Sequence, residues 1–133
     1  MLLSRVVGGG LIVAVCMMNP VLASAEGSRC DAVERARVQM RQLPREQNPS
    51  SEFAAGAARN RALATIFRTA AAESVDPIVR DRAAAAAAGF DQWADFLGTA
   101  TGTEDLATPR GQEALTGSLT PIVALEGVCP IPG

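Results

Sequence analysis

Two cysteines constrain this chain more than any other feature, because they bracket almost all of the part that would fold. Cys30 follows an apolar N-terminal segment, and Cys129 lies close to the last residue, Gly133. An exported chain is expected to oxidise such a pair. The closed loop would hold about 100 residues, for which chain entropy gives about 4.7 kcal/mol of stabilisation. We therefore predict a disulfide between Cys30 and Cys129 that contributes much of the stability.

Residues 1–25 are predicted to be a cleaved signal peptide. Arg5 supplies a positive charge, an uncharged and mostly apolar run follows, and residues 23–25 (Ala-Ser-Ala) are the small residues that signal peptidase requires. The apolar run is shorter than the roughly 20 residues of a membrane-spanning helix. A lipid anchor on Cys16 is the alternative, although a valine precedes it where a smaller residue is usual. The mature protein is then a single domain, residues 26–133, secreted or held in the cell envelope.

Apolar residues recur at helical spacing along the rest of the chain, and no segment shows the alternation of a convincing strand. The first helix is expected from 28 to 43 and the second from about 50 to 74. The third should begin at Asp76-Pro77, a capping residue followed by a preorganised proline. It should end at Gly98, which is a candidate for a left-handed cap.

Thr108-Pro109 predicts the start of a fourth helix by the same reasoning, after a loop rich in glycine and threonine. Pro121 is expected to kink or split this helix, because an internal proline removes a backbone hydrogen bond. Four helices that run up, down, up and down would bring Cys30 and Cys129 to the same end, whereas three helices would separate them. The predicted fold class is therefore all-α: a four-helix up-down-up-down bundle whose ends are joined by a disulfide.

The third helix carries the clearest apolar seam, within an arc of about 80° at 100° per residue. Its members are Val79, Ala83, Ala86, Phe90, Trp93 and Leu97. Trp93 is therefore predicted to be core. Phe96 points about 100° away from the seam centre, so it is the better candidate for an exposed binding patch.

Few side chains in the sequence could perform catalysis. Histidine, lysine and tyrosine are absent, so the usual bases that activate a nucleophile are missing. Asp91 and Asp95, one helical turn apart, could share a proton or a metal ion, but both fall on the side of the helix away from the seam. We predict no enzymatic activity, no cofactor and no metal site. An enzyme that uses acids alone is an alternative.

Asn60 lies within the apolar arc of the second helix, where a polar group needs a partner. A hydrogen bond to a neighbouring helix is one interpretation. The other is a pocket for a small apolar ligand between the helices, lined by Asn60, Phe67, Phe90 and Trp93. The function predicted from these features is a non-enzymatic binding or interaction module of the cell envelope, with a carrier of a small apolar ligand as the alternative.

Charge narrows the possible partners. The formal net charge of −2 argues against a general nucleic-acid binder. Between residues 29 and 45, however, arginines outnumber acids, whereas acids dominate from 91 to 126. Either the first and fourth helices compensate each other, or the basic strip faces an anionic envelope component or another envelope protein.

The layout resembles that of small exported helical proteins of actinobacteria, and among them it is similar to a haemophore-like group. The matching features are Cys30, the helix that follows it, and Cys129 near the C-terminus. The resemblance implies an exported all-helical domain and carries no specific motif. The chain does not fit haem binding, because histidine and tyrosine are absent and Met40 is the only methionine after residue 25.

Overall fold

The computed structural model describes residues 29–44 and 52–132. Within these residues there are no strands, so the all-α fold class is confirmed. The helices are α2 (Asp31–Gln42), α3 (Glu52–Glu73), α4 (Pro77–Thr99), the short 3-10 helix η1 (Thr103–Ala107) and α5 (Pro109–Val128). The predicted signal peptide and the Cys16 lipid anchor lie outside the described residues.

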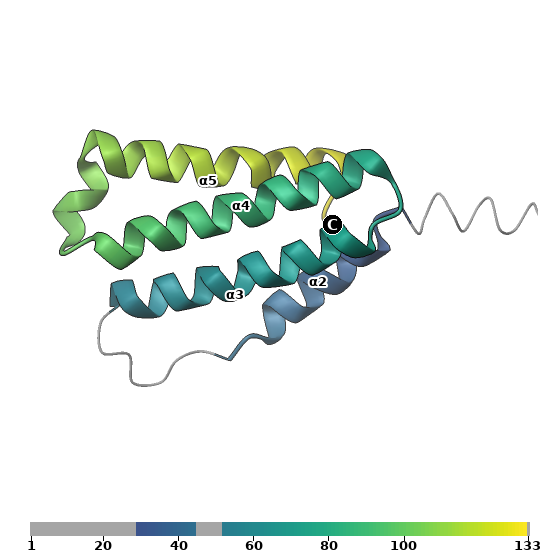
Figure 1. Cartoon of the computed structure of the whole chain (residues 1–133), viewed down its shortest axis with the longest axis horizontal. Helices are drawn as coiled ribbons and strands as arrows, with labels where there is room; N and C mark the ends of the chain where they lie inside the picture. The colour runs from purple at the N-terminus through teal and green to yellow at the C-terminus, as the bar shows by residue number, and fades with distance from the viewer. Residues whose placement is uncertain (1–28, 45–51, 133) are drawn as a thin grey trace, which may run out of the picture.

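The helices differ in length, and this difference divides the molecule into two parts. α3, α4 and α5 contain 22, 23 and 20 residues and lie side by side, whereas α2 contains 12 and packs mainly against α3 (Figure 1). At 1.5 Å per residue, α2 can accompany its neighbours for only about half of their length. We call the part that includes α2 the disulfide half, and the part that includes η1 the η1 half.

The predicted starts of α4 and α5 are confirmed, because each depends on a local cap. α2 begins at Asp31 instead of the predicted residue 28, and the predicted start of the second helix near residue 50 lies outside the described residues. The Asp76 side chain accepts hydrogen bonds from the backbone N–H groups of Ile78 and Val79, at 2.9 and 3.0 Å. The Thr108 hydroxyl accepts one from the N–H of Gly111, at 3.1 Å. In both cases a proline follows the cap, as expected at the first helical position.

The predicted end of α4 is wrong. α4 runs through Gly98 to Thr99, and the backbone N–H of Ala100 closes it with a hydrogen bond to Phe96 O. None of the glycines that the structure describes has a positive φ, so Gly98 forms no left-handed cap.

The predicted split of the fourth helix is also wrong, because α5 is one helix with Pro121 inside it. Tight packing against α4 accounts for this continuity. A Cβ added to Gly89 of α4 would lie 2.9 Å from Ser118 O and 3.0 Å from Cγ of Pro121. The missing side chain at Gly89 therefore lets α4 approach α5 closely at Ser118 and Pro121.

A disulfide joins Cys30 to Cys129, with their Cα atoms 5.7 Å apart, which confirms the predicted pairing. It lies beside the larger hydrophobic cluster, in which Val33, Val79 and Cys129 are fully buried. This cluster brings together residues from α2, α3, α4 and α5, so all four helices contribute to the core of the disulfide half.

The η1 half has a separate, smaller cluster around Phe96, Leu97 and Ala114. Here η1 replaces a fourth helix and lies very close to the start of α5. A Cβ on Gly111 would lie 2.8 Å from Leu106 O, so the backbones can approach only because this residue is a glycine.

The prediction for Phe96 is wrong, since its side chain is 3% exposed, whereas Trp93 is only partly buried. The prediction from a single apolar seam assumes that a helix buries only one face. α4 instead lies between α3 and α5, so it buries residues on both flanks of the seam. Trp93 lies on the seam itself, in the η1 half, beyond the reach of α2.

Across residues 29–44 and 52–132, no helix combines the length and the apolar character that crossing a membrane requires.

Candidate functional site

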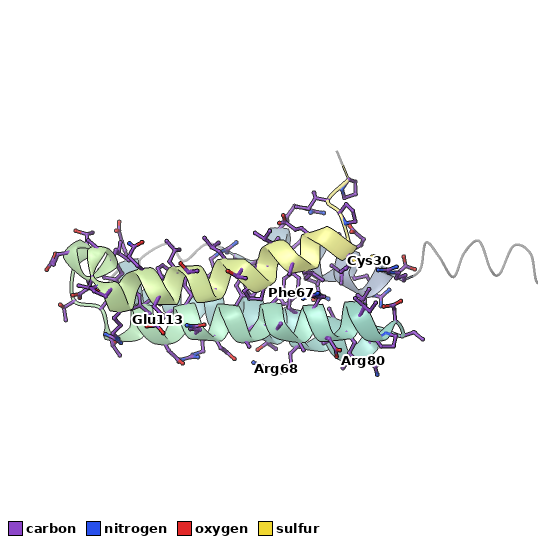
Figure 2. All side chains as sticks on the ribbon, turned by 90° about the horizontal axis from the view of Figure 1, so that it is seen from above. Cys30, Phe67, Arg68, Arg80 and Glu113 are labelled. Carbon is purple, nitrogen blue, oxygen red and sulfur yellow. A yellow bond between two sulfur atoms is a disulfide. The ribbon has the colours of Figure 1, made fainter. Side chains whose placement is uncertain are left out.

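Two of the four residues predicted to line a pocket lie together. The rings of Phe67 and Phe90 are 5.4 Å apart between centroids and are tilted by 37°. Both border a cavity of about 110 Å³ between the helices of the disulfide half. Figure 2 shows Phe67 in this half, between α5 and the helices below it. Phe67 and Phe90 therefore border the same cavity, which lies in the disulfide half.

Asn60 and Trp93 do not line this cavity. The Asn60 side-chain amide donates to Gly56 O of its own helix at 2.8 Å, so the predicted bond to a neighbouring helix is wrong. Trp93 stacks on Phe96 in the η1 half, with ring centroids 5.3 Å apart and an angle of 21° between the planes. Asn60 is thus held by its own helix, and Trp93 by the ring of Phe96.

The cavity has an apolar interior and a charged edge. Its apolar lining comes from α2, α3, α4 and α5: Met40, Phe67, Ala86, Phe90, Ile122 and Leu125. Ile131 of the C-terminal tail forms a further part of the wall, and the charged residues at the edge are Arg37, Arg41 and Glu126. A cavity of this kind suits a small ligand with one apolar end and one polar end.

Arg37 is a structural residue that the sequence did not reveal. It is only 5% exposed, although it carries a guanidinium group. Its N–H groups donate to Cys129 O at 2.5 Å, to Pro130 O at 3.4 Å and to the Glu34 carboxylate at 2.6 Å. Arg37 therefore fixes the C-terminal tail against α2 and places a positive charge at the end of α5, where the helix dipole favours a cation.

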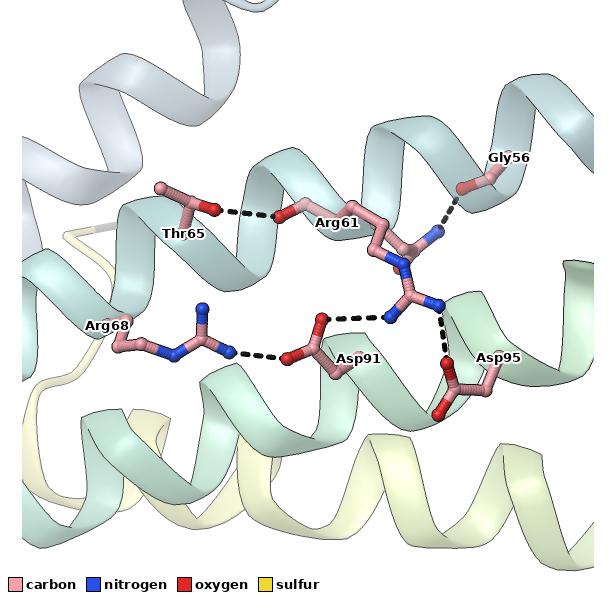
Figure 3. A network of polar contacts seen from close by, with 7 residues as sticks. Gly56, Arg61, Thr65, Arg68, Asp91 and Asp95 are labelled. Carbon is pink, nitrogen blue, oxygen red and sulfur yellow. Dashed lines mark hydrogen bonds and ion pairs between the residues drawn. The ribbon is translucent and has the colours of Figure 1, made fainter.

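Asp91 and Asp95, considered as a possible acid pair, are held by arginines of α3. Arg61 forms ion pairs with both carboxylates, at 3.2 Å to Asp91 and more closely to Asp95, and Arg68 pairs with Asp91 (Figure 3). The hydrogen bonds to Asp95 and Asp91 raise the pKa of Arg61 above its ordinary value. This surface network joins α3 to α4.

A proton-sharing or metal-binding role does not fit that arrangement. Each carboxylate of the pair already has a cationic partner, and within the described residues no group of three or more potential ligands could hold a metal ion. The arrangement of Asp91 and Asp95 thus serves the contact between two helices.

The expected charge compensation between the first and fourth helices is not found. Arg35 of α2 pairs with Glu73 of α3 at 3.5 Å, and Arg29 pairs with Asp76 at 3.8 Å. Among the ion pairs of the described residues, none joins α2 to α5. The link from α2 to α5 is made instead by the disulfide and by Arg37.

Comparison with protein families, curated proteins and solved structures finds no match. Function therefore has to be argued from the surfaces and cavities of the molecule.

One face of α5 is apolar and exposed. Leu115, Leu119 and Val123 follow one another at intervals of four residues and are 37, 49 and 63% exposed. No charged residue occurs between Glu113 and Glu126. These two acids flank the apolar row along α5. Since α5 packs mainly against α4 and η1, this α5 face has no covering element among the described helices.

Proposed function

We propose that the protein is an exported, non-enzymatic interaction module of the cell envelope, and that it binds a protein partner through the α5 face. The observation that carries the proposal is the row Leu115, Leu119 and Val123, which are the exposed large hydrophobic residues of α5. Exposed apolar rows bordered by polar residues are typical of interaction surfaces. The acids at each end of the row would set the position of a partner helix.

The proposal includes the finer architecture and the location. The four helices alternate in direction, and the axis of α5 bends at Pro121, where a proline ring and a missing N–H disturb the helix. Residues 1–25 direct export and are then removed. The supporting features are the disulfide, which is typical of exported proteins, and the small residues at 23–25.

Export can be tested by intact mass spectrometry of the protein recovered from outside the cytoplasm. We expect a chain that begins at Glu26 and lacks two hydrogens because of the disulfide. A chain that begins at a diacylglycerol-modified Cys16 would contradict the proposal of a freely exported domain.

The α5 face can be tested by site-specific crosslinking in the envelope of the producing cell. A photo-crosslinking amino acid replaces Leu119 in one variant and Glu113 in a matched control, which lies about 120° away around the same helix. Both residues are exposed, and Figure 2 shows Glu113 at the side of α5. We expect one discrete partner adduct from position 119 and none from position 113.

The substitution Leu119→Glu then tests whether the adduct depends on apolar contact. A crosslinker at Val123 should lose its adduct in this variant, while the thermal midpoint stays within a few degrees because Leu119 is half exposed. Equal adducts at 119 and 113, or adducts formed only between copies of this chain, would contradict a separate protein partner.

A further inference from the structure

The geometry points to a ligand site inside the disulfide half: we propose that the cavity beside Phe67 and Phe90 binds a short-chain carboxylate. The cavity volume is about 110 Å³. An apolar cavity of roughly 150 Å³ is known to hold one benzene molecule, so this smaller one fits a chain of about four or five carbons whose head group lies at the edge. The site is distinct from the α5 face and does not depend on the function proposed for that face.

The interior favours an apolar group over water. The inner wall consists of two aromatic rings, one methionine and aliphatic side chains, and none of these offers a strong hydrogen bond. A water molecule needs two or more polar partners to be stable in such a space. A hydrocarbon group, in contrast, gains contacts with every wall.

The edge of the cavity selects the head group. Two guanidinium groups, Arg37 and Arg41, and one carboxylate, Glu126, border it. Arg37 is already committed to Glu34 and to two carbonyls of the tail. Arg41 is exposed and forms no ion pair with any other residue that the structure describes. Its planar guanidinium group is suited to a carboxylate.

The tail completes the wall. Ile131 borders the cavity, and the two residues before it are held by Arg37 and by the disulfide. Arg37 is thus a positioning residue for the site, whereas Arg41 is the residue that would contact the ligand.

Met40 provides a direct probe, because its side chain lines the cavity. The full chain, labelled with ¹³C at the methionine methyl groups, is titrated with hexanoate, hexanol and hexylamine, and Met40→Leu assigns the signal. We expect hexanoate to shift the Met40 signal saturably, hexanol to bind more weakly and hexylamine most weakly. No saturable shift, or binding of hexylamine at least as tight as that of hexanoate, would overturn the proposal.

Two neighbouring alanines test whether the space exists. Ala86 borders the cavity, whereas Ala87 is equally buried and does not. Ala86→Leu should keep the thermal midpoint and abolish the hexanoate shift, because its added carbons occupy the cavity. Ala87→Leu should lower the midpoint, because it forces extra volume into packed core. If both variants lose stability equally, the cavity is too small to accept a ligand.

Arg41→Gln tests the head group. The affinity for hexanoate should fall about two- to fivefold, the range expected for an exposed ion pair, and that for hexanol should not change. Glu126→Gln is the matched control at the same edge and should not weaken hexanoate binding. An unchanged ratio of hexanoate to hexanol affinity in Arg41→Gln would refute the carboxylate preference.

Discussion

The two halves of the molecule are stabilised in different ways. In the disulfide half, four helices surround one cluster, and a covalent bond and the buried Arg37 hold α2 to the end of α5. In the η1 half, three helices and η1 enclose a smaller cluster of aromatic and aliphatic side chains. There the Arg110 guanidinium lies 5.4 Å from the centre of the Phe96 ring, which is a cation–π contact.

The difference follows from the length of one helix. α2 ends at Gln42 and cannot reach the η1 half, so the seam of α4 is covered near Val79 and partly exposed near Trp93. A short helix also buries little surface by itself, and a covalent link compensates for this. The disulfide joins the end of α5 to α2, which otherwise packs mainly against α3.

Loss of the disulfide should be the most damaging change. The bond closes a loop with a sequence separation of 99 residues, for which chain entropy gives about 4.7 kcal/mol. The Cys30→Ser, Cys129→Ser double mutant should remain helical in the cold, and its thermal midpoint by circular dichroism should fall by well over about 10 °C. Amide exchange should accelerate more in α2 than in α4. A midpoint that does not move would show that the bond is not formed in the native protein.

The η1 half should depend most on Phe96. Phe96→Ala is expected to cost about 3–5 kcal/mol, because the ring is almost completely buried. Phe90→Ala should cost less, because Phe90 is only partly buried and already borders a cavity. Urea unfolding of both variants measures the difference. A larger loss of stability in Phe90→Ala than in Phe96→Ala would mean that the partly buried Phe90 contributes more to packing than we infer.

Local features of the fold could be predicted from the sequence, whereas the burial of Phe96 could not. Helix starts at Asp76 and Thr108 were predictable, because a cap and the proline after it act within one turn. The disulfide was predictable from the positions of the cysteines. The burial of Phe96 was not, because it requires that α4 has neighbours on two sides, and a helical wheel does not contain this information.

The candidate sites show the same limit. Phe67 and Phe90 were identified as pocket residues from their apolar arcs, and they do line one cavity. Arg37 was missed, since its partners Cys129 and Pro130 lie more than ninety positions away in the sequence. Its spacing from Glu34 was a visible signal, but that spacing is equally typical of a solvated pair.

The contribution of Arg37 can be compared with that of Arg35, two positions earlier in the same helix. Arg37→Ala should cost about 2–3 kcal/mol, because it leaves carbonyl groups at the end of α5 without their donor. Arg35→Ala should stay within about 0.5 kcal/mol, because its pair with Glu73 is exposed. Urea unfolding of the oxidised proteins gives both values. Equal losses would show that Arg37 contributes no more than a surface charge.

The smallest expected effect is a pH dependence confined to the η1 half. The Asp105 carboxylate accepts hydrogen bonds from the backbone N–H of Thr101 at 2.7 Å and from its hydroxyl at 3.2 Å. The backbone bond from Thr101 lowers the pKa of Asp105 below its ordinary value of 3.8. A lowered pKa in the folded state means that the contribution to stability is present above about pH 4 and is lost as the pH falls through the folded-state value.

Amide exchange at Thr101 measures this effect locally. Protection should be greater in the natural protein than in Asp105→Asn at about pH 6, and the difference should vanish at about pH 2, where the carboxylate is protonated. Amides of α2, in the disulfide half, should show no difference between the two proteins at either pH, because the hydrogen bonds of the Asp105 carboxylate go to Thr101 and Gly102 in the η1 half. A difference in amide exchange in α2 would mean that the two halves unfold as one unit. The two halves would then differ in how their side chains pack but not in their stability.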